Sequence, residues 1–534
     1  MDIFNRIIRR LKREINLQSN RIQIWRITRS FSGGLIKSDK LPVIFFNAST
    51  RLSGLSLNAG FSLITSLALR KNKIPVYYFV CNHGLHPCML GTDKMDLSTE
   101  PPCRECVRTS RIVLGKTNIQ HFSYVVNEEI GREIKNLTLG QLMTYVYKDI
   151  PLGKLVLPSM RWILRRHHLK DTEENRSLAQ SYIQSAWGVY REFTKMIDSI
   201  HPQAVVVFNG MFYPEAMARL SAQHRKVPVF SHEIGMLPYS AFFTDKEATA
   251  YPVDVDNEFR LSRDQEMRLD NYLTNRFEGK FQTAGIQFWP EMRHFSTDFL
   301  EEMKKYSAMV PVFTNVIFDT SQSHANTLFE HMFAWLNLVI EKVKQHPEIL
   351  FVIRAHPDET RPGKESRESV SEWVAMYGIK EIPNIIYIPP EEYISSYELI
   401  KYAKFVMVYN STVGLEASIM GKPVLCAGKA RYTQVPTVYF PESKSVYIKL
   451  LEEFLESDTV EHPKVFIENA RRVLYSQLFR ASLPFDQFLM YDGVWRGYVR
   501  LRSFPPKLLI QGQNETIDVV FNGIIKNQPF IREI

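Results

Sequence analysis

An alternation of short strand patterns with helical patterns, which occurs twice along the chain, limits the fold more than any other feature. The first series has strand patterns at 41–48, 74–81, 204–208 and 227–232, with helical patterns between them. Units of strand, loop, helix and strand build parallel sheets that carry helices on both faces. The first half is therefore predicted to be a doubly wound α/β domain.

The alternation restarts at residue 310, after a charged helical connector at about 262–277. Its strand patterns include 310–318, 349–355 and 423–428. A chain of 534 residues is too long for one hydrophobic core, which agrees with two such units. Two successive Rossmann-like halves predict a cleft lined by the carboxyl ends of their strands.

The expected organisation has four segments. Residues 1–40 form a basic amphipathic helix and a linker, and residues 41–300 form the first Rossmann-like domain, with a cysteine-rich loop at 81–106 and a helical insert. Residues 301–445 form the second Rossmann-like domain, and residues 446–534 form helices and a mixed tail.

The net charge of +9 is concentrated at the amino terminus. Residues 1–40 hold ten basic and three acidic residues, a local excess of +7, which leaves +2 for the rest of the chain. Surfaces that follow nucleic-acid phosphates need a clustered basic patch on the folded body. A nucleic-acid partner is therefore not expected.

The amino-terminal segment has apolar residues at helical spacing, with arginines on the other faces. The apolar positions are Phe4, Ile7, Ile8, Leu11 and Ile15. Two interpretations stay open: residues 1–30 lie on an anionic membrane surface, or the helix packs on the protein's own body. Because no signal peptide or spanning apolar run is evident, we expect a cytoplasmic protein, peripheral on the inner face of the cell membrane in the first interpretation.

The segment after the strand pattern at 405–409 carries the strongest indication of a ligand site. Ser411 and Thr412 stand where a helix begins, so their hydroxyls and free backbone N–H groups would attract phosphate. Gly414 would permit close approach of a ligand, and Glu416 could accept hydrogen bonds from a ribose. The alternative is ordinary helix capping by Ser411 or Thr412, with Glu416 on a solvated face.

Two further strand ends carry candidate catalytic groups. Arg354 and His356 leave one strand on the same side, where His356 could meet a phosphate or a leaving oxygen and Arg354 could stabilise negative charge. The alternative is a His-Pro turn with a surface arginine. Glu233 faces the predicted cleft from the first half, as a general base or, alternatively, as a surface carboxylate in a glycine turn. Asn209, Asn315 and Asp319 are strand-end residues suited to line the same cleft.

The order of these motifs resembles that of the capsular polysaccharide biosynthesis glycosyltransferases, which are related to the Kdo transferases of capsule assembly. The motifs are NGMFYPEA, HEIG, FTNVIFDTS, VIRAHPDE, IPPEEYISSYELI and VYNSTVGLEASIMGKPVLCAG, and the resemblance covers about residues 41–440. It implies a GT-B fold in which residues 301–445 hold a nucleotide-sugar donor and residues 41–300 hold the acceptor. It also implies that catalysis requires no metal or other cofactor.

The resemblance implies residue roles as well. Related enzymes that use CMP-linked acid sugars carry an acidic-glycine motif for the base, which Glu233 and Gly235 match, although a single acid precedes the glycine here. They carry a His-Pro motif at the donor phosphate, which His356 matches, and paired hydroxyls there, which Ser411 and Thr412 match.

These observations predict transfer of a sugar from a nucleotide-sugar to a surface or capsular polysaccharide or glycolipid acceptor, polymeric or lipid-linked. Glu233 or a neighbouring carboxylate would take the acceptor proton, while His356 and Arg354 offset charge on the departing phosphate. Two alternatives stay open. One is a nucleotide-sugar 2-epimerase, and the other is a non-catalytic GT-B protein of polysaccharide assembly.

Four of the five cysteines lie in one loop, at Cys81, Cys88, Cys103 and Cys106. Four thiolates could close a tetrahedral structural zinc site, although six residues separate the first pair instead of two to four. Disulfides are not expected in a chain without a secretory signal. Zinc, an iron–sulfur cluster and reduced thiols are therefore the alternatives.

Overall fold

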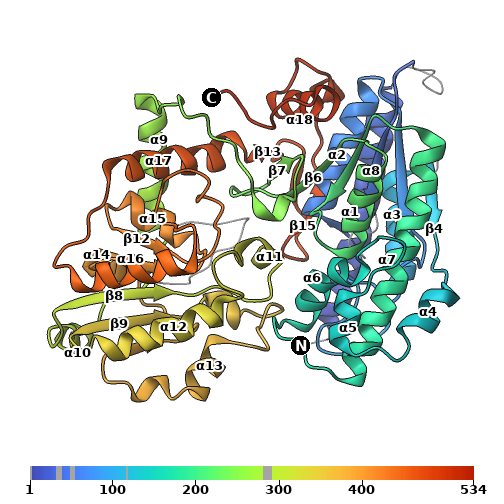
Figure 1. The fold of residues 1–534 in the computed structure, drawn as a ribbon. Coiled ribbons are helices and arrows are strands. Elements are labelled where there is room, and N and C mark those ends of the chain that lie inside the picture. The colour runs from blue at the N-terminus through green and yellow to red at the C-terminus, as the bar shows by residue number, and fades with distance from the viewer. Residues whose placement is uncertain (1–2, 32–38, 48–53, 116–117, 281–291) are drawn as a thin grey trace.

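The computed structural model describes residues 3–31, 39–47, 54–115, 118–280 and 292–534. Two α/β lobes stand side by side (Figure 1). Each lobe is built on its own sheet, and the cavity described below lies between them. The predicted fold class is confirmed: two Rossmann-like domains face a central cleft in the GT-B arrangement.

The first domain contains a seven-stranded sheet in the order β13-β7-β6-β5-β1-β3-β4. Its parallel strands are β1 (Val43–Asn47), β3 (Val76–Cys81), β4 (Ile119–Phe122), β5 (Ala204–Phe208) and β6 (Val229–Ile234). The antiparallel strands β7 (Ser240–Thr244) and β13 (Leu483–Pro484) close one edge. The chain proceeds outward from β1 in both directions, so the sheet has its topological switch point between β1 and β5.

Both faces of this sheet are covered because successive residues of a strand point to opposite sides. Val43 and Phe45 enter one core, and Ile44 and Phe46 enter the other. The first core is covered by α2 (Leu57–Lys71) and α18 (Glu515–Lys526). The second is covered mainly by α6 (Leu152–Leu164), α7 (Glu173–Ile200) and α8 (Tyr213–His224), with the small helices α4 (Glu128–Ile134) and α5 (Leu139–Thr144).

The second domain has a five-stranded parallel sheet in the order β10-β9-β8-β11-β12. The strands are β8 (Ala308–Phe313), β9 (Ile349–Arg354), β10 (Ile385–Ile388), β11 (Val406–Val408) and β12 (Val424–Cys426). One face packs on α12 (Met332–Gln345), α13 (Val370–Met376) and α16 (Lys444–Glu456). The other packs on α9 (Arg263–Phe277), α10 (Thr297–Met303), α14 (Ser396–Tyr402), α15 (Val413–Ile419) and α17 (Lys464–Tyr475).

Two boundaries differ from the sequence-based expectation. Leu269 and Leu273 of α9 are buried in the second domain's core, so that domain begins well before residue 301. The strand expected at 310–318 ends at Phe313, where Thr314 donates a side-chain hydrogen bond to the Arg354 carbonyl and Asn315 donates one to Asn410.

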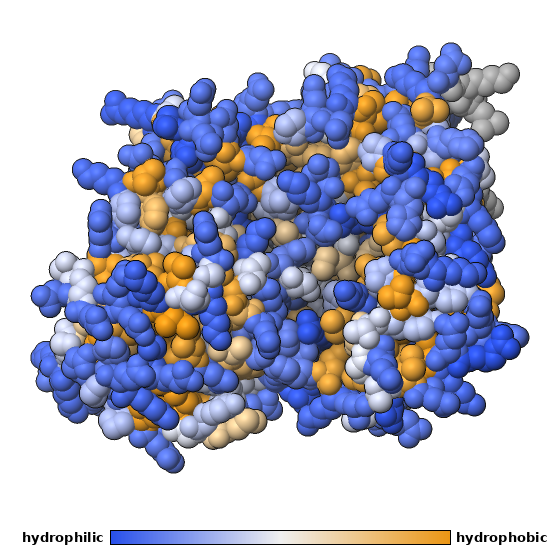
Figure 2. All heavy atoms as spheres, in the orientation of Figure 1, coloured by the Kyte–Doolittle hydropathy of each residue, from blue (hydrophilic) through white to orange (hydrophobic). Residues whose placement is uncertain are grey.

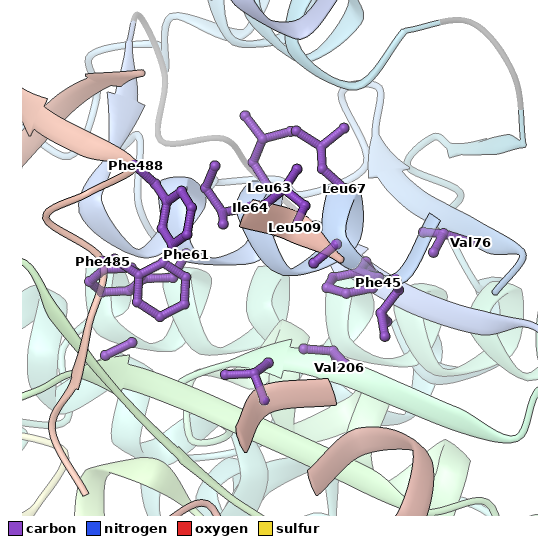
Figure 3. Packing of buried hydrophobic residues seen from close by; sticks show 14 of the residues in the cluster. Phe45, Phe61, Leu63, Ile64, Leu67, Val76, Val206, Phe485, Phe488 and Leu509 are labelled. Atoms are coloured by element: carbon purple, nitrogen blue, oxygen red, sulfur yellow. The ribbon is translucent and has the colours of Figure 1, made fainter. Parts of the chain in front are cut away.

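The carboxyl-terminal tail returns to the first domain. After α17, β13 pairs with β7, and β14 (Leu489–Tyr491) and β15 (Tyr498–Leu501) form a small sheet with β2 (Leu55–Ser56). Figure 3 shows Phe485 and Phe488 against Phe61 of α2. The tail is therefore part of the first domain's core.

The two lobes also touch each other directly. Arg165, after α6, forms an ion pair with Glu365 at 2.6 Å. His168 contacts the Glu368 carboxylate and lies 3.2 Å from His331 at the start of α12. None of the described helices is both long and apolar enough to cross a lipid bilayer.

Candidate active site

A cavity of about 790 Å³ lies between the domains at the carboxyl ends of β8, β9, β11 and β12. Figure 2 shows the recess between the two lobes. The first domain contributes Lys94, Trp162, Lys246, Glu247 and Thr249, and the second contributes Asn315, Asp319, Arg354, His356, Ser411, Thr412, Glu416 and Lys429. The volume is that of sites for nucleotide-sized ligands.

The lining carries a surplus of positive charge. Seven basic and five acidic side chains border the cavity. The basic ones are Lys94, Lys246, Arg276, Arg354, Lys364, Lys429 and Arg431, and the acidic ones are Glu247, Asp254, Asp319, Asp358 and Glu416. A cleft with this balance favours an anionic ligand.

The paired hydroxyls lie where the sequence predicts them. β11 ends at Val408, α15 begins at Val413, and Ser411 and Thr412 line the cavity between the two elements. Thr412 precedes α15 without a side-chain capping hydrogen bond, so the alternative of ordinary capping does not describe it. Its hydroxyl is accordingly available to a ligand.

Lys429 is a cationic residue of this edge that sequence reasoning missed. Strand β12 is paired with β11 in the register Val408 to Cys426, so the residues that follow the two strands meet at the same edge. Lys429 is exposed and lines the cavity. A lysine directly after the strand predicted at 423–428, which follows the segment that carries the Ser-Thr pair, was the available signal.

Two glycines have structural roles that differ from those expected. A Cβ on Gly414 would lie 2.5 Å from the Tyr432 hydroxyl and 3.0 Å from Val408, so this glycine makes room for the protein interior and not for a ligand. A Cβ on Gly235 would lie 2.4 Å from the Ser240 hydroxyl, inside the turn after β6. The expectation for Gly414 was wrong because the neighbour that requires the glycine is Tyr432, eighteen positions further along the chain.

His356 follows β9 and lines the cavity. Its Nδ1 accepts a hydrogen bond from the Asp358 backbone N–H at 3.1 Å, which leaves Nε2 to carry the proton of the neutral ring. Burial lowers the pKa of His356, although Asp358 opposes this effect. The ring is therefore a neutral N–H donor near pH 7.

Arg354 has a different setting from the one predicted. It is 3% exposed, and its guanidinium donates to the Pro389 carbonyl at 2.7 Å and to the Glu392 carbonyl at 2.6 Å. Burial lowers its pKa to about 10. Arg354 borders the cavity but holds the loop after β10 in place. It is thus not the surface arginine of the alternative interpretation.

Glu416 is buried and already has protein partners. One carboxylate oxygen accepts from Arg276 of α9 at 2.7 Å, and the other accepts from the Tyr397 hydroxyl at 2.7 Å. Although burial acts in the opposite direction, Glu416 and Tyr397 raise the pKa of Arg276, which stays charged. All three residues line the cavity. A ribose would therefore meet a preformed cluster and not a free carboxylate.

Asn315 and Asp319 border the cavity after β8. The Asn315 side chain donates to Asn410 at 2.6 Å, which ties the end of β8 to the end of β11. Asp319 is exposed and accepts from the Ser321 hydroxyl at 2.7 Å. Asn315 thus shapes the wall, whereas Asp319 presents its carboxylate to the cavity.

Glu233 lies near the carboxyl end of β6, next to β5 in the first sheet. Asn58 of α2 donates to one carboxylate oxygen at 2.9 Å, and Asn209 donates to the other at 3.2 Å. Asn209 also accepts from the backbone N–H of Met211 at 2.9 Å. Among the described residues that line the cavity, Glu233, Asn209 and Gly235 do not occur. The structure joins Glu233 to Asn209 by a hydrogen bond, but neither is among the residues that border the cavity, where the sequence predicted them.

Glu247 and Asp254 are first-domain carboxylates that border the cavity, and sequence reasoning missed both. Glu247 has the clearer setting. It forms an ion pair with Arg219 at 2.5 Å, on the side facing His324. Burial raises the pKa of Glu247, but Arg219 outweighs that effect and the pKa is lowered. An ionised carboxylate therefore stands in the wall opposite the second domain.

The four loop cysteines do not fit a closed metal site as they lie. Across the described parts of the chain, no three His, Cys, Asp or Glu side chains are placed to share a metal ion. Burial raises the pKa of Cys81 to about 12 and that of Cys88 to about 11. The neighbouring thiols add to both shifts, and zinc, an iron–sulfur cluster and reduced thiols stay open as predictions.

Residues 261–435 match the family model described as capsule polysaccharide biosynthesis protein. This range contains the second-domain motifs, from FTNVIFDTS to VYNSTVGLEASIMGKPVLCAG, whereas NGMFYPEA and HEIG precede it. No curated protein matches the chain in sequence.

Among solved structures, the chain is similar to two Kdo transferases and to nucleotide-sugar epimerases. KpsC of Thermosulfurimonas dismutans, as β-Kdo 2,4-transferase, is 12% identical over 51% of this chain and 79% of that one, with a TM-score of 0.35. The KpsC β-Kdo 2,7-transferase of the same organism is 15% identical over 58% of this chain and 85% of that one, with a TM-score of 0.32. The UDP-GlcNAc 2-epimerase of Neisseria meningitidis is 14% identical over 82% of this chain and 98% of that one, with a TM-score of 0.25.

The family model covers the strand ends that form the second domain's wall of the cavity. Residues 261–435 therefore carry the sequence signature of the capsule polysaccharide biosynthesis family, within a chain that has the two-domain GT-B architecture.

Proposed function

We propose that this protein is a glycosyltransferase that moves a sugar from a nucleotide-sugar donor to a hydroxyl of a surface or capsular polysaccharide or a glycolipid. The second domain holds the donor, and the first domain holds the acceptor. The family signature over residues 261–435 supports this role.

One observation carries the proposal: donors for a phosphate converge at the carboxyl ends of β9, β11 and β12. His356 offers Nε2–H, Ser411 and Thr412 offer hydroxyls, and Lys429 offers a positive charge, all along the wall of one cavity. Hydrogen bonds to a charged partner are the stronger ones. These groups can offset the charge that develops on a departing nucleotide phosphate.

We propose that these four residues stabilise the negative charge of the departing phosphate without a metal ion. Arg354 acts through the loop that it anchors, and Glu416 with Arg276 and Tyr397 bounds the space for the nucleotide. A CMP-linked acid sugar is the first donor to test, because its carboxylate and phosphate both suit a cationic wall.

Glu233 is the proposed base, oriented by the hydrogen bonds that Asn58 and Asn209 donate to its carboxylate. Glu247 is the second carboxylate to test, because it borders the cavity. We expect Glu233→Gln to lower the transfer rate at least a hundredfold with unchanged donor binding. If Glu247→Gln has that effect and Glu233→Gln does not, the base is Glu247.

The donor is identified by thermal shift of the purified chain with CMP-, UDP- and GDP-linked sugars, since a ligand that binds only the folded state raises the melting temperature. Nucleotide release is then measured with and without polysaccharide or lipid-linked acceptor. Release that depends on acceptor supports transfer. Interconversion of donor sugars without acceptor would indicate an epimerase, and neither reaction would indicate a binding protein.

His356→Ala tests the phosphate site. We expect at least a hundredfold loss of transfer with the melting temperature retained, because the variant removes one donor to the leaving group. His346→Ala is the matched control, since His346 precedes the same strand at its opposite end. Transfer by His356→Ala within a few-fold of the wild type would remove this residue from the mechanism.

A further inference from the structure

Helix α1 (Ile3–Arg29) is attached to the first domain by one face. Leu17, Ile24 and Ile27 of this face are buried in the first core, and Asn20 accepts a hydrogen bond from the Leu501 backbone N–H at 2.8 Å. The contacts are with β15 and with α3 (Cys103–Leu114). The helix therefore has a fixed orientation on the body.

The opposite face of α1 presents large apolar side chains to solvent. Phe4 is 65% exposed, Leu11 is 59% exposed and Ile15 is 67% exposed. The complete outward stripe is Phe4, Ile7, Leu11, Ile15, Ile22 and Trp25. At 3.6 residues per turn these six side chains fall within an arc of about 80°, centred opposite the buried face. The stripe runs along the helix with Gln18 between Ile15 and Ile22, and Arg29 lies over the Trp25 ring at 5.0 Å.

Basic side chains flank the outward stripe on both sides. The sequence of α1 contains eight Lys and Arg residues and a single acid, Glu14. Glu14 is paired with Arg108 of α3 at 2.7 Å. Arg10 and Arg21 lie on one flank, and Lys12 and Arg26 on the other, all exposed. An apolar stripe between cationic flanks is the pattern of a helix that lies in the surface of an anionic bilayer.

We propose that the outward stripe of α1 docks on an anionic lipid membrane, and that the rigid attachment of α1 sets how the first domain meets that membrane. A second copy of the chain fits this surface poorly, because two such helices would bring like charges together. The interpretation in which the helix packs on the protein's own body is confirmed for one face, and the membrane interpretation is proposed here for the other face. This inference does not depend on which donor the cavity binds.

The test is flotation of the full-length chain with phosphatidylcholine vesicles that contain either no anionic lipid or about 30% phosphatidylglycerol. We expect the protein to float with the anionic vesicles and not with the vesicles that lack anionic lipid. The triple variant Leu11→Ser, Ile15→Ser and Ile22→Ser should bind them at least tenfold more weakly. The double variant Arg10→Gln and Arg21→Gln should also bind the anionic vesicles about tenfold more weakly. Raising the salt concentration should weaken binding of the wild type by a similar factor.

The matched control replaces exposed apolar residues of the second domain: Met376→Ser, Val446→Ser and Val465→Ser, which should float like the wild type. The α1 variants should keep the melting temperature and the donor-induced thermal shift, so failure here is distinguishable from failure of the proposed function. Equal binding of both vesicle types, no binding, or flotation of the triple variant like the wild type would overturn the proposal. Dimerisation without lipid that the triple variant abolishes would instead assign the stripe to a second copy.

Discussion

Glu359 offers a quantitative test of the environment behind the His356 loop. It is 1% exposed, and both carboxyl oxygens lie near the Val370 backbone N–H, at 3.1 and 3.2 Å. Burial raises the pKa of Glu359 to about 8. Glu359→Gln keeps the shape of the protonated acid but cannot ionise.

The sign and size of the effect follow from proton linkage. In the unfolded chain this carboxyl loses its proton near its ordinary pKa of 4.5, whereas in the folded protein it does so near 8. Between these values the unfolded state binds fewer protons, so wild-type stability falls as the pH rises through the window. The full difference between the two pKa values corresponds to about 5 kcal/mol in the free energy of unfolding. At about pH 5, less than about 1 kcal/mol of this stability is lost.

The assay is thermal unfolding of wild type and Glu359→Gln from about pH 5 to about pH 8.5. We expect similar melting temperatures at the acidic end and an advantage of roughly 5–10 °C for the variant at the alkaline end. Glu341→Gln, on the exposed side of α12, controls for the lost charge. A constant gap across this range, or a variant that is less stable at alkaline pH, would refute the reasoning.

Two further predictions concern packing around the cavity. Gly414→Ala should destabilise the protein by about 1–3 kcal/mol in denaturant unfolding, because the new Cβ meets the Tyr432 hydroxyl at 2.5 Å; Gly188→Ala on α7, with no atom within 4 Å of its Cβ, should not destabilise it. Glu416→Gln should cost about 3–5 kcal/mol, because it leaves the Arg276 guanidinium buried without its carboxylate, and Arg276→Met combined with Glu416→Leu should recover much of that loss. A cost for Glu416→Gln below about 1 kcal/mol would contradict the buried-pair argument.

Much of the architecture was predictable because it depends on local patterns. Apolar runs such as 43–46 and 309–313 indicate strands that are buried on both faces, and the helical patterns between them require parallel pairing. Parallel pairing in turn brings the carboxyl ends of β9 and β11 to one edge, so His356 and Ser411 border one cavity although they are far apart in sequence. The amphipathic pattern of residues 3–29 was equally visible.

Other features depend on which distant segments pack together, and the sequence pattern does not encode them locally. The partner of Glu416 is Arg276, 140 positions away, and Gly414 is needed because of Tyr432. Glu247 borders the cavity and Glu233 does not, which depends on how the loops of the first domain lie against the second.

The sequence by itself determined the two α/β units, the motif-bearing strand ends and the basic amphipathic helix, because periodicity and turn residues act between near neighbours. The tertiary structure decided which face of α1 stays exposed, where the tail returns, and which carboxylates and cations share the cavity. Those outcomes depend on burial and charge pairing between remote segments, where the free energy of a side chain is set by the neighbours it meets in space.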